Sequence, residues 1–204
     1  MSAAGIMNGE IPGVEMLAAV LDDAICSASA VPQLTASRDL DLGTAYRIQR
    51  PGSGFRVDRG ESVVGAKLGF TSKAKAEQMG VSDVIAGVLT SGMHLDDGGT
   101  VDLARLIHPR IEPEIAFRLS RAIDPLDPLE NVWSAVDAVA PAMEVIDSRY
   151  RDFSFSLADV VADNTSAAGY VVGGWLDPAG VELNDLGVTL EVDGDVVETG
   201  TTAA

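Results

Sequence analysis

Three glutamates inside apolar, strand-like runs constrain the fold of this chain more than any other feature. Glu112 and Glu114 lie in Ile111-Glu-Pro-Glu-Ile-Ala-Phe117, and Glu144 lies in Pro141-Ala-Met-Glu-Val-Ile-Asp147. A buried carboxylate without a partner is very costly, so each must be neutralised, paired or bound to a metal. Side chains two residues apart on a strand point to the same face, which places Glu112 and Glu114 together. The fold must therefore bring a compensating group to that face.

A third carboxylate from another strand would complete an all-oxygen site. Such a site suits a hard divalent cation, Mg²⁺ or Mn²⁺. The alternative is that Glu112 and Glu114 lie on a solvated outer face, as most such pairs do. The apolar flanks and Glu144 favour the metal hypothesis, but the residues alone leave both interpretations open. Pro113 cannot donate to a strand ladder, so its strand is predicted to be an edge strand or to bulge there.

The charge balance excludes several classes of partner. The chain of 204 residues has 31 acidic and 14 basic residues, a net charge of -17. Nucleic acids and anionic membranes need a basic surface, so neither is an expected partner. An acidic substrate would need a local positive centre, which a bound metal could supply. The single cysteine, Cys26, excludes an intrachain disulfide and favours a cytoplasmic setting, and no apolar run is long enough to span a membrane.

The order of elements predicts an α+β fold, with a helical N-terminal region (1–60) and a mixed β region (61–204) that form one continuous domain. Two amphipathic helices are expected in the first region, one after Pro12 and one that ends near Gln49, before a turn at Pro51-Gly-Ser-Gly54. The second region is expected to contain strands at 63–70, around 101, at 111–119, 142–146 and 170–175, a hairpin at 190–197 with its turn at Asp193-Gly194, and helices at 72–78 and 127–139.

Two polar groups are open to more than one interpretation. Lys67 lies between Gly65 and Gly69 in a predicted strand. The pattern favours an exposed lysine on the outer face, and the functional alternative is a partly buried lysine that pairs with a carboxylate or exchanges protons. Arg149 and the polar segment 159–164 could line a pocket in which the guanidinium grips a carboxylate. They could equally be turn and capping residues.

Five ordered segments carry a family likeness that extends over nearly the whole chain. They are Gly65-Ala-Lys-Leu-Gly-Phe-Thr-Ser72, Gln78-Met-Gly-Val81, Leu106-Ile-His-Pro-Arg-Ile-Glu-Pro-Glu-Ile-Ala-Phe117, Met143-Glu-Val-Ile-Asp-Ser-Arg-Tyr150 and Val160-Val-Ala-Asp-Asn164. With these segments in this order, the chain resembles the hydratase/decarboxylase branch of the fumarylacetoacetate hydrolase superfamily. The resemblance implies a fumarylacetoacetate-hydrolase-like mixed β-roll or barrel with a helical N-terminal region.

The resemblance also implies roles for individual residues. It implies a metal site at Glu112, Glu114 and Glu144, an active-site lysine at Lys67, and a position for Ser166 near the substrate. Substrate contacts are expected from Arg149, Asn164 and Ile85. Hydratases of this branch typically have an aspartate where this chain has Ile85. An apolar wall suits the loss of CO₂, whereas the addition of water needs a placed acid or base.

The implied activity is metal-dependent decarboxylation of 2-oxo-3-hexenedioate to 2-hydroxypenta-2,4-dienoate in aromatic meta-cleavage catabolism. Two alternatives stay open, a 2-hydroxypenta-2,4-dienoate hydratase and a non-catalytic truncated homologue. Members of the branch continue past the position of Ala204 with further strands and a loop rich in glycine, serine and threonine. We therefore expect an incomplete C-terminal part. We also expect a homo-oligomer, and a complex with the hydratase of the same pathway.

Overall fold

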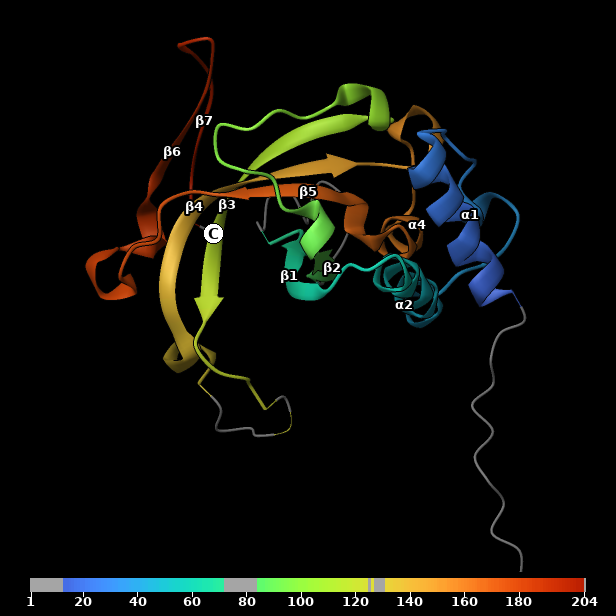
Figure 1. The fold of residues 1–204 in the computed structure, drawn as a ribbon, viewed down its shortest axis with the longest axis horizontal. Helices are drawn as coiled ribbons and strands as arrows, with labels where there is room; N and C mark the ends of the chain where they lie inside the picture. The colour runs from blue at the N-terminus through green and yellow to red at the C-terminus, as the bar shows by residue number, and fades with distance from the viewer. Residues whose placement is uncertain (1–12, 72–83, 125, 127–130, 204) are drawn as a thin grey trace, which may run out of the picture.

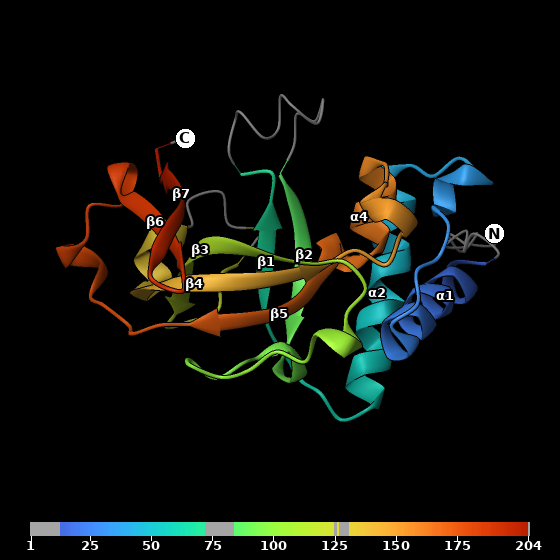
Figure 2. The same ribbon diagram turned by 90° about the horizontal axis from the view of Figure 1, so that it is seen from above.

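The computed structural model describes residues 13–71, 84–124, 126 and 131–203. Helices lie at one end, a three-stranded antiparallel sheet runs through the middle, and a hairpin projects at the other end (Figures 1 and 2). The chain thus combines helices with antiparallel sheets, as predicted. Among the described helices, none has the length and apolar character of a membrane span. Short 3-10 turns connect the main elements: 34–36, 91–93, 103–105, 132–135, 151–153, 164–166, 178–180 and 183–185.

Three helices form one packed end of the molecule. The first, α1 (Val14–Ser27), buries four residues at helical spacing along one face: Leu17, Ala18, Leu21 and Ala24. Helix α2 (Leu42–Asp58) begins after Asp41, whose side chain accepts a hydrogen bond from the Thr44 backbone N–H. The short helix α4 (Leu157–Ala162) begins with a capping box between Ser156 and Asp159. The apolar faces of these helices share one core.

The predicted turn at 51–54 is wrong, because α2 continues through Pro51 to its end at Asp58. Residues on both sides of the proline are held by tertiary contacts. Ile48 is fully buried, and Phe55 packs against the same core. Gln49 is buried as well, and its side-chain amide donates to a strand carbonyl at 2.9 Å. This packing outweighs the local cost of a proline and two glycines in a helix.

The central sheet has the strand order β3-β4-β5, all antiparallel. Its strands are β3 (Pro109–Leu119), β4 (Val136–Asp147) and β5 (Ala167–Val172). Strand β3 pairs only with β4 among the described strands, so it lies at the edge, as Pro113 predicts. The register places Glu112 directly opposite Glu144 and Glu144 directly opposite Tyr170.

Two predictions near this sheet are wrong in part. The segment from Val136 onward is strand rather than the end of a helix, and the start of that predicted helix, 127–130, lies outside the described residues. Ala138, Val139 and Ala140 are all buried in succession. A strand covered on both faces has no alternation, so its apolar residues also fit a helical spacing. Strand β5 also ends at Val172, earlier than expected.

The remaining strands form two hairpin-like pairs. Strands β1 (Val63–Gly69) and β2 (Ile85–Thr90) pair antiparallel and lie against the central sheet (Figure 1). Strands β6 (Gly187–Val192) and β7 (Asp195–Thr201) form the projecting hairpin, with the predicted turn at Asp193 and Gly194. Both turn residues have positive φ, 55° and 87°. The predicted strand around 101 is not formed, and the predicted helix at 72–78 lies outside the described residues.

Candidate metal centre and active site

Three carboxylates converge on one face of the central sheet. Glu112 and Glu144 are cross-strand neighbours on β3 and β4, and Glu114 lies two residues further along β3. One carboxylate oxygen from each lies within 4.8 Å of the others. Two oxygens on opposite sides of one Mg²⁺, each about 2.1 Å from it, are about 4.2 Å apart. The cluster therefore has nearly the spacing that a single bound cation requires.

Glu144 is the buried member of the cluster, and its nearby positive charge does not offset the cost of its burial beside two further carboxylates. Burial raises the pKa of Glu144 to about 7, Lys67 opposes that rise, and Glu112 and Glu114 add to it. Its Oε1 atom is buried without a hydrogen-bond partner in the described part of the chain. Buried polar oxygens are nearly always satisfied. An unsatisfied oxygen on a residue flanked by two further carboxylates therefore fits the binding of a divalent cation.

Lys67 lies beside this cluster rather than on an outer face. Its Nζ atom lies 3.0 Å from Glu144 Oε2 and donates to the Thr165 carbonyl oxygen at 3.2 Å. Only 10% of its side chain is exposed. The interpretation as a solvent-exposed lysine is therefore wrong. The physical reason is that β1 belongs to a two-stranded sheet laid against β4, so one of its faces is turned to the glutamates.

The turn at 164–166 contacts Lys67, and the backbone of this turn is unusual. Asn164, Thr165 and Ser166 all have positive φ, at 50°, 51° and 60°. The Asn164 side chain pairs with the backbone of Val88 on β2, donating to its carbonyl at 2.9 Å and accepting from its N–H at 2.7 Å. The Ser166 hydroxyl is buried without a hydrogen-bond partner among the described residues. Hydrogen bonds between this turn and the strands β1 and β2 thus bring three predicted site residues together: Lys67, Asn164 and Ser166.

Gly87 is a residue of this site that the sequence analysis did not identify. It lies opposite Lys67 in the β1–β2 register. A Cβ atom at this position would lie 2.2 Å from Thr165 Oγ1 and 2.7 Å from the Asn164 carbonyl oxygen. The second contact is with backbone, so rotation of a side chain would not relieve it. Strand β2 and the turn can approach this closely only because residue 87 is glycine.

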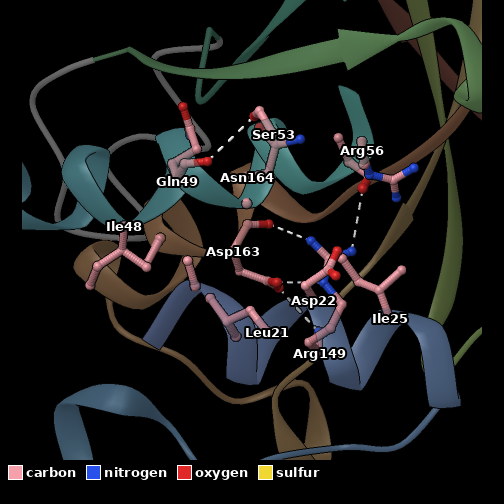
Figure 3. A pocket seen from close by; sticks show the side chains of 14 residues that line it. Leu21, Asp22, Ile25, Ile48, Gln49, Ser53, Arg56, Arg149, Asp163 and Asn164 are labelled. Carbon is pink, nitrogen blue, oxygen red and sulfur yellow. Dashed lines mark hydrogen bonds and ion pairs between the residues drawn. The ribbon is translucent and has the colours of Figure 1, made fainter. Parts of the chain in front are cut away.

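Arg149 has a different environment from the one expected for a substrate ligand. Its Nε donates to Asp163 Oδ1, its Nη2 donates to the Asp163 carbonyl, and its Nη1 donates to the carbonyls of Asp147 and Ala167. The paired side chains are 2% and 1% exposed. Figure 3 shows this pair beside a small cavity between α1 and α2. The guanidinium thus holds buried chain segments together, and four of its five N–H donors are used in these bonds.

Ile85 lies on the same face of β2 as Gly87, two residues away, and hence on the face that carries the Lys67 side chain. It is 3% exposed and belongs to the core formed with the helices. It therefore packs β2 onto the helical core, two residues from Gly87, the cross-strand neighbour of Lys67.

Tyr170 is a further residue that the sequence analysis placed only in a strand. It is the cross-strand neighbour of Glu144, so its side chain lies on the same face as the carboxylates. Partial burial raises the pKa of its hydroxyl. The ring of His94 lies 5.5 Å from its ring, measured between centroids. The proximity of Tyr170 to Glu144 depends on the strand register, so the sequence carries no signal for it.

Known proteins match most of this chain in sequence. A 4-oxalocrotonate decarboxylase from a Pseudomonas species is 50% identical over 192 residues, which are 94% of this chain and 74% of that protein. The chain belongs to the 4-oxalocrotonate decarboxylase and hydratase family. A 2-keto-4-pentenoate hydratase from Paraburkholderia xenovorans (strain LB400) is 38% identical, over 81% of this chain and 62% of the hydratase. No protein-family model matches the chain.

A solved structure of this family shares the fold. The 4-oxalocrotonate decarboxylase from Pseudomonas putida G7, complexed with magnesium and adipate, superposes with a TM-score of 0.87 at 38% identity. The match covers 93% of this chain and 73% of that one. A complex of the same enzyme with calcium and acetate gives a TM-score of 0.86. The wider assignment to a fumarylacetoacetate-hydrolase-like fold stays a prediction.

Proposed function

We propose that this chain is a metal-dependent lyase that removes CO₂ from 2-oxo-3-hexenedioate (4-oxalocrotonate) and yields 2-hydroxypenta-2,4-dienoate. The observation that carries the proposal is the buried pair of Lys67 and Glu144 within a cluster of three carboxylates. The family relationship supports the choice of reaction, since decarboxylases in it reach 50% identity and the hydratase from Paraburkholderia xenovorans is 38% identical.

Glu112, Glu114 and Glu144 would hold the cation. Their donor set is entirely carboxylate oxygen, which favours Mg²⁺ or Mn²⁺ over metals that prefer nitrogen or sulfur. The unsatisfied Oε1 of Glu144 is the observation on this chain that fits such an ion. When bound, the cation supplies Lewis-acid chemistry to an adjacent 2-oxo acid.

Lys67 would stabilise the negative charge that develops on the 2-oxo oxygen of the substrate. When the bond to the distal carboxylate breaks, its electron pair moves through the conjugated carbons onto the 2-oxo oxygen. The Lys67 ammonium has three donors, and Glu144 and the Thr165 carbonyl take two of them. The third can donate to the developing enolate oxygen and give it a proton, which completes the 2-hydroxydienoate. Ser166, whose buried hydroxyl is free of protein partners within the described ranges, would contribute a further hydrogen bond to substrate.

Ile85 would favour decarboxylation over hydration. Its buried, apolar side chain borders the face of Lys67 and offers no group that could activate water. The departing carboxylate becomes neutral CO₂, so a desolvating wall helps it to leave. An acid or base at this position would favour the hydratase reaction instead. For Arg149 we propose no contact with substrate, since its side chain is buried and paired with Asp163.

The test is to supply 2-oxo-3-hexenedioate and 2-hydroxypenta-2,4-dienoate separately, with Mg²⁺, with Mn²⁺ and with a chelator. Release of CO₂ and ultraviolet absorbance are followed for each substrate. We expect metal-dependent decarboxylation and little hydration. Hydration as fast as decarboxylation would reject the proposed reaction and favour the hydratase. Glu144→Gln serves as the inactive control. Self-association, and association with a hydratase of the same pathway, stay predictions.

A further inference from the structure

We propose that Asn164 is a positioning residue, whose side-chain amide clamps a left-handed turn onto β2 so that the Thr165 carbonyl fixes Lys67 beside Glu144. The expected effect on kcat rests on the proposed function, whereas the expected effect on the position of Lys67 does not. It differs from the expected role of Asn164 as a substrate ligand. The structure connects the amide to the lysine in three steps, through Val88, the turn and the Thr165 carbonyl.

The first step is the clamp itself. The Asn164 amide makes two hydrogen bonds to the same residue of β2, at 2.7 Å to the Val88 N–H and 2.9 Å to the Val88 carbonyl. This pattern reproduces the pairing of a neighbouring strand on the outer edge of β2. It uses the amide oxygen and one of the two amide protons. Both hydrogen bonds are made within the protein, and together they fix the orientation of the side chain.

The second step is the backbone that the clamp holds. Three successive residues with positive φ are rare, because the left-handed region costs non-glycine residues roughly 1–2 kcal/mol each. Such a segment persists only when its surroundings determine it. Here the Asn164 amide holds its first residue, and the Ser166 N–H donates to the Asp163 carbonyl at 2.9 Å at its end. Gly87 provides the space beneath it.

The third step is the consequence for the lysine. In this conformation the Thr165 carbonyl accepts a hydrogen bond from Lys67 Nζ at 3.2 Å. The same nitrogen lies 3.0 Å from Glu144 Oε2, so the ammonium has two separate acceptors. Two fixed acceptors define where the ammonium lies and which donor remains for substrate. The same turn places the buried Ser166 hydroxyl. A turn displaced from β2 would leave the lysine with Glu144 alone, and its position along the carboxylate would no longer be fixed.

The experiment compares Asn164→Ala, Asn164→Gly and Gly87→Ala with the wild-type protein. Asn164→Gly tolerates the left-handed backbone but lacks the clamp, so it isolates the amide. Gly87→Ala pushes the turn away from β2 by steric contact with Thr165 and the Asn164 carbonyl, and leaves the Asn164 side chain itself unchanged. The added methyl group would also lie 3.2 Å from Lys67 Cδ, so the two Asn164 variants carry the test of the amide. The matched control is Asn131→Ala, because the Asn131 side chain also accepts a backbone N–H, at 3.1 Å, but lies at the surface. All four variants are assayed well below their melting midpoints.

Two kinds of measurement separate the outcomes. In all three test variants we expect kcat to fall about 10- to 100-fold, as small misplacements of a catalytic group do, with little change in KM or in Mn²⁺ affinity. We also expect Lys67 to react several-fold faster with an acylating reagent, measured by peptide mass spectrometry, because it loses one of its fixed acceptors. The control should behave like the wild type in both.

Three results would overturn the inference. A raised KM with unchanged kcat would make Asn164 a substrate ligand. A lowered melting midpoint with normal kcat would make the clamp structural only. Unchanged labelling of Lys67 would show that the turn does not position it. The labelling needs no substrate, so it still decides the inference if the wild-type protein fails to decarboxylate 2-oxo-3-hexenedioate and the proposed function is rejected.

Discussion

Replacement of Lys67 by methionine separates the electrostatic role of the lysine from its role in turnover. Methionine keeps most of the apolar stem and removes the charge. The pair that it breaks is buried, with 10% of the lysine side chain and 5% of the Glu144 side chain exposed. Loss of one partner from a buried ion pair costs about 3–5 kcal/mol, because the other charge is left uncompensated. The Thr165 carbonyl would also lose its donor, at about 1 kcal/mol.

We therefore expect Lys67→Met to lower the free energy of unfolding of the metal-free protein by about 3 kcal/mol or more. A divalent cation should restore much of this loss, since it supplies the positive charge that Glu144 lacks and stabilises the folded state by mass action. Decarboxylation should not recover. The loss of a positioned proton donor typically lowers kcat by about 10²- to 10⁴-fold.

Urea unfolding with and without Mg²⁺, together with turnover of 2-oxo-3-hexenedioate, measures both effects. Arg118→Met is the matched control, since Arg118 pairs with Asp137 at 2.8 Å but their side chains are 52% and 41% exposed. An exposed pair contributes less than about 1 kcal/mol, so this variant should be nearly as stable as the wild type. A Lys67→Met protein with near-normal kcat would remove the lysine from the mechanism, and one with unchanged metal-free stability would refute the electrostatic argument.

Three further variants test other parts of the site and fold. Glu144→Gln should weaken Mn²⁺ binding more than about tenfold, measured by calorimetry, because the buried ligand loses its charge; unchanged affinity would reject the metal centre. Ile85→Asp should slow decarboxylation, followed as CO₂ release, since a carboxylate draws in water and repels the departing group; a faster rate would reject the apolar-wall argument. Asp159→Asn should lower the free energy of unfolding by about 2 kcal/mol at pH 7, because Thr35 and Ser156 donate to the carboxylate. Burial raises the pKa of Asp159, but these hydrogen bonds outweigh it and hold the pKa below 3.8. The stability that they give is therefore present above pH 3.8 and lost as the pH falls through the folded-state pKa, so the difference between variant and wild type should shrink in acid unfolding measurements below about pH 4.

The sequence could predict those parts of the site that lie on regular strands. Period-two spacing places Glu112 and Glu114 on one face, as observed, and their apolar flanks together with Glu144 in a second apolar run favour a shared metal site. The position of Pro113 predicts an edge strand or a bulge, and β3 is an edge strand among the strands that the structure describes. The hairpin turn at Asp193-Gly194 is likewise a local property of two residues that adopt positive φ. Each of these predictions depends on chain geometry over a few residues.

Other features depend on contacts that no local pattern contains. The helix through Pro51 exists because the tertiary core holds both of its halves, against its own propensity. The burial of Lys67 depends on how β1 lies against β4, and the sequence pattern favoured the opposite. Arg149 could not be distinguished from a substrate ligand, because an internal partner such as Asp163, fourteen residues away, satisfies a guanidinium as well as a substrate carboxylate does.

The charge of the site explains why a cation and the lysine are needed together. Three carboxylates and one ammonium converge here, so the fully ionised cluster is negative overall, in a chain that already has a net charge of -17. A 2-oxo-enedioate carries two further negative charges and would be repelled from such a surface. A divalent cation neutralises the cluster and so removes this repulsion, and it also gives Glu144 Oε1 a partner. In the proposed reaction, Lys67 would then stabilise the charge that develops only during the reaction, and an interaction of that kind lowers the barrier.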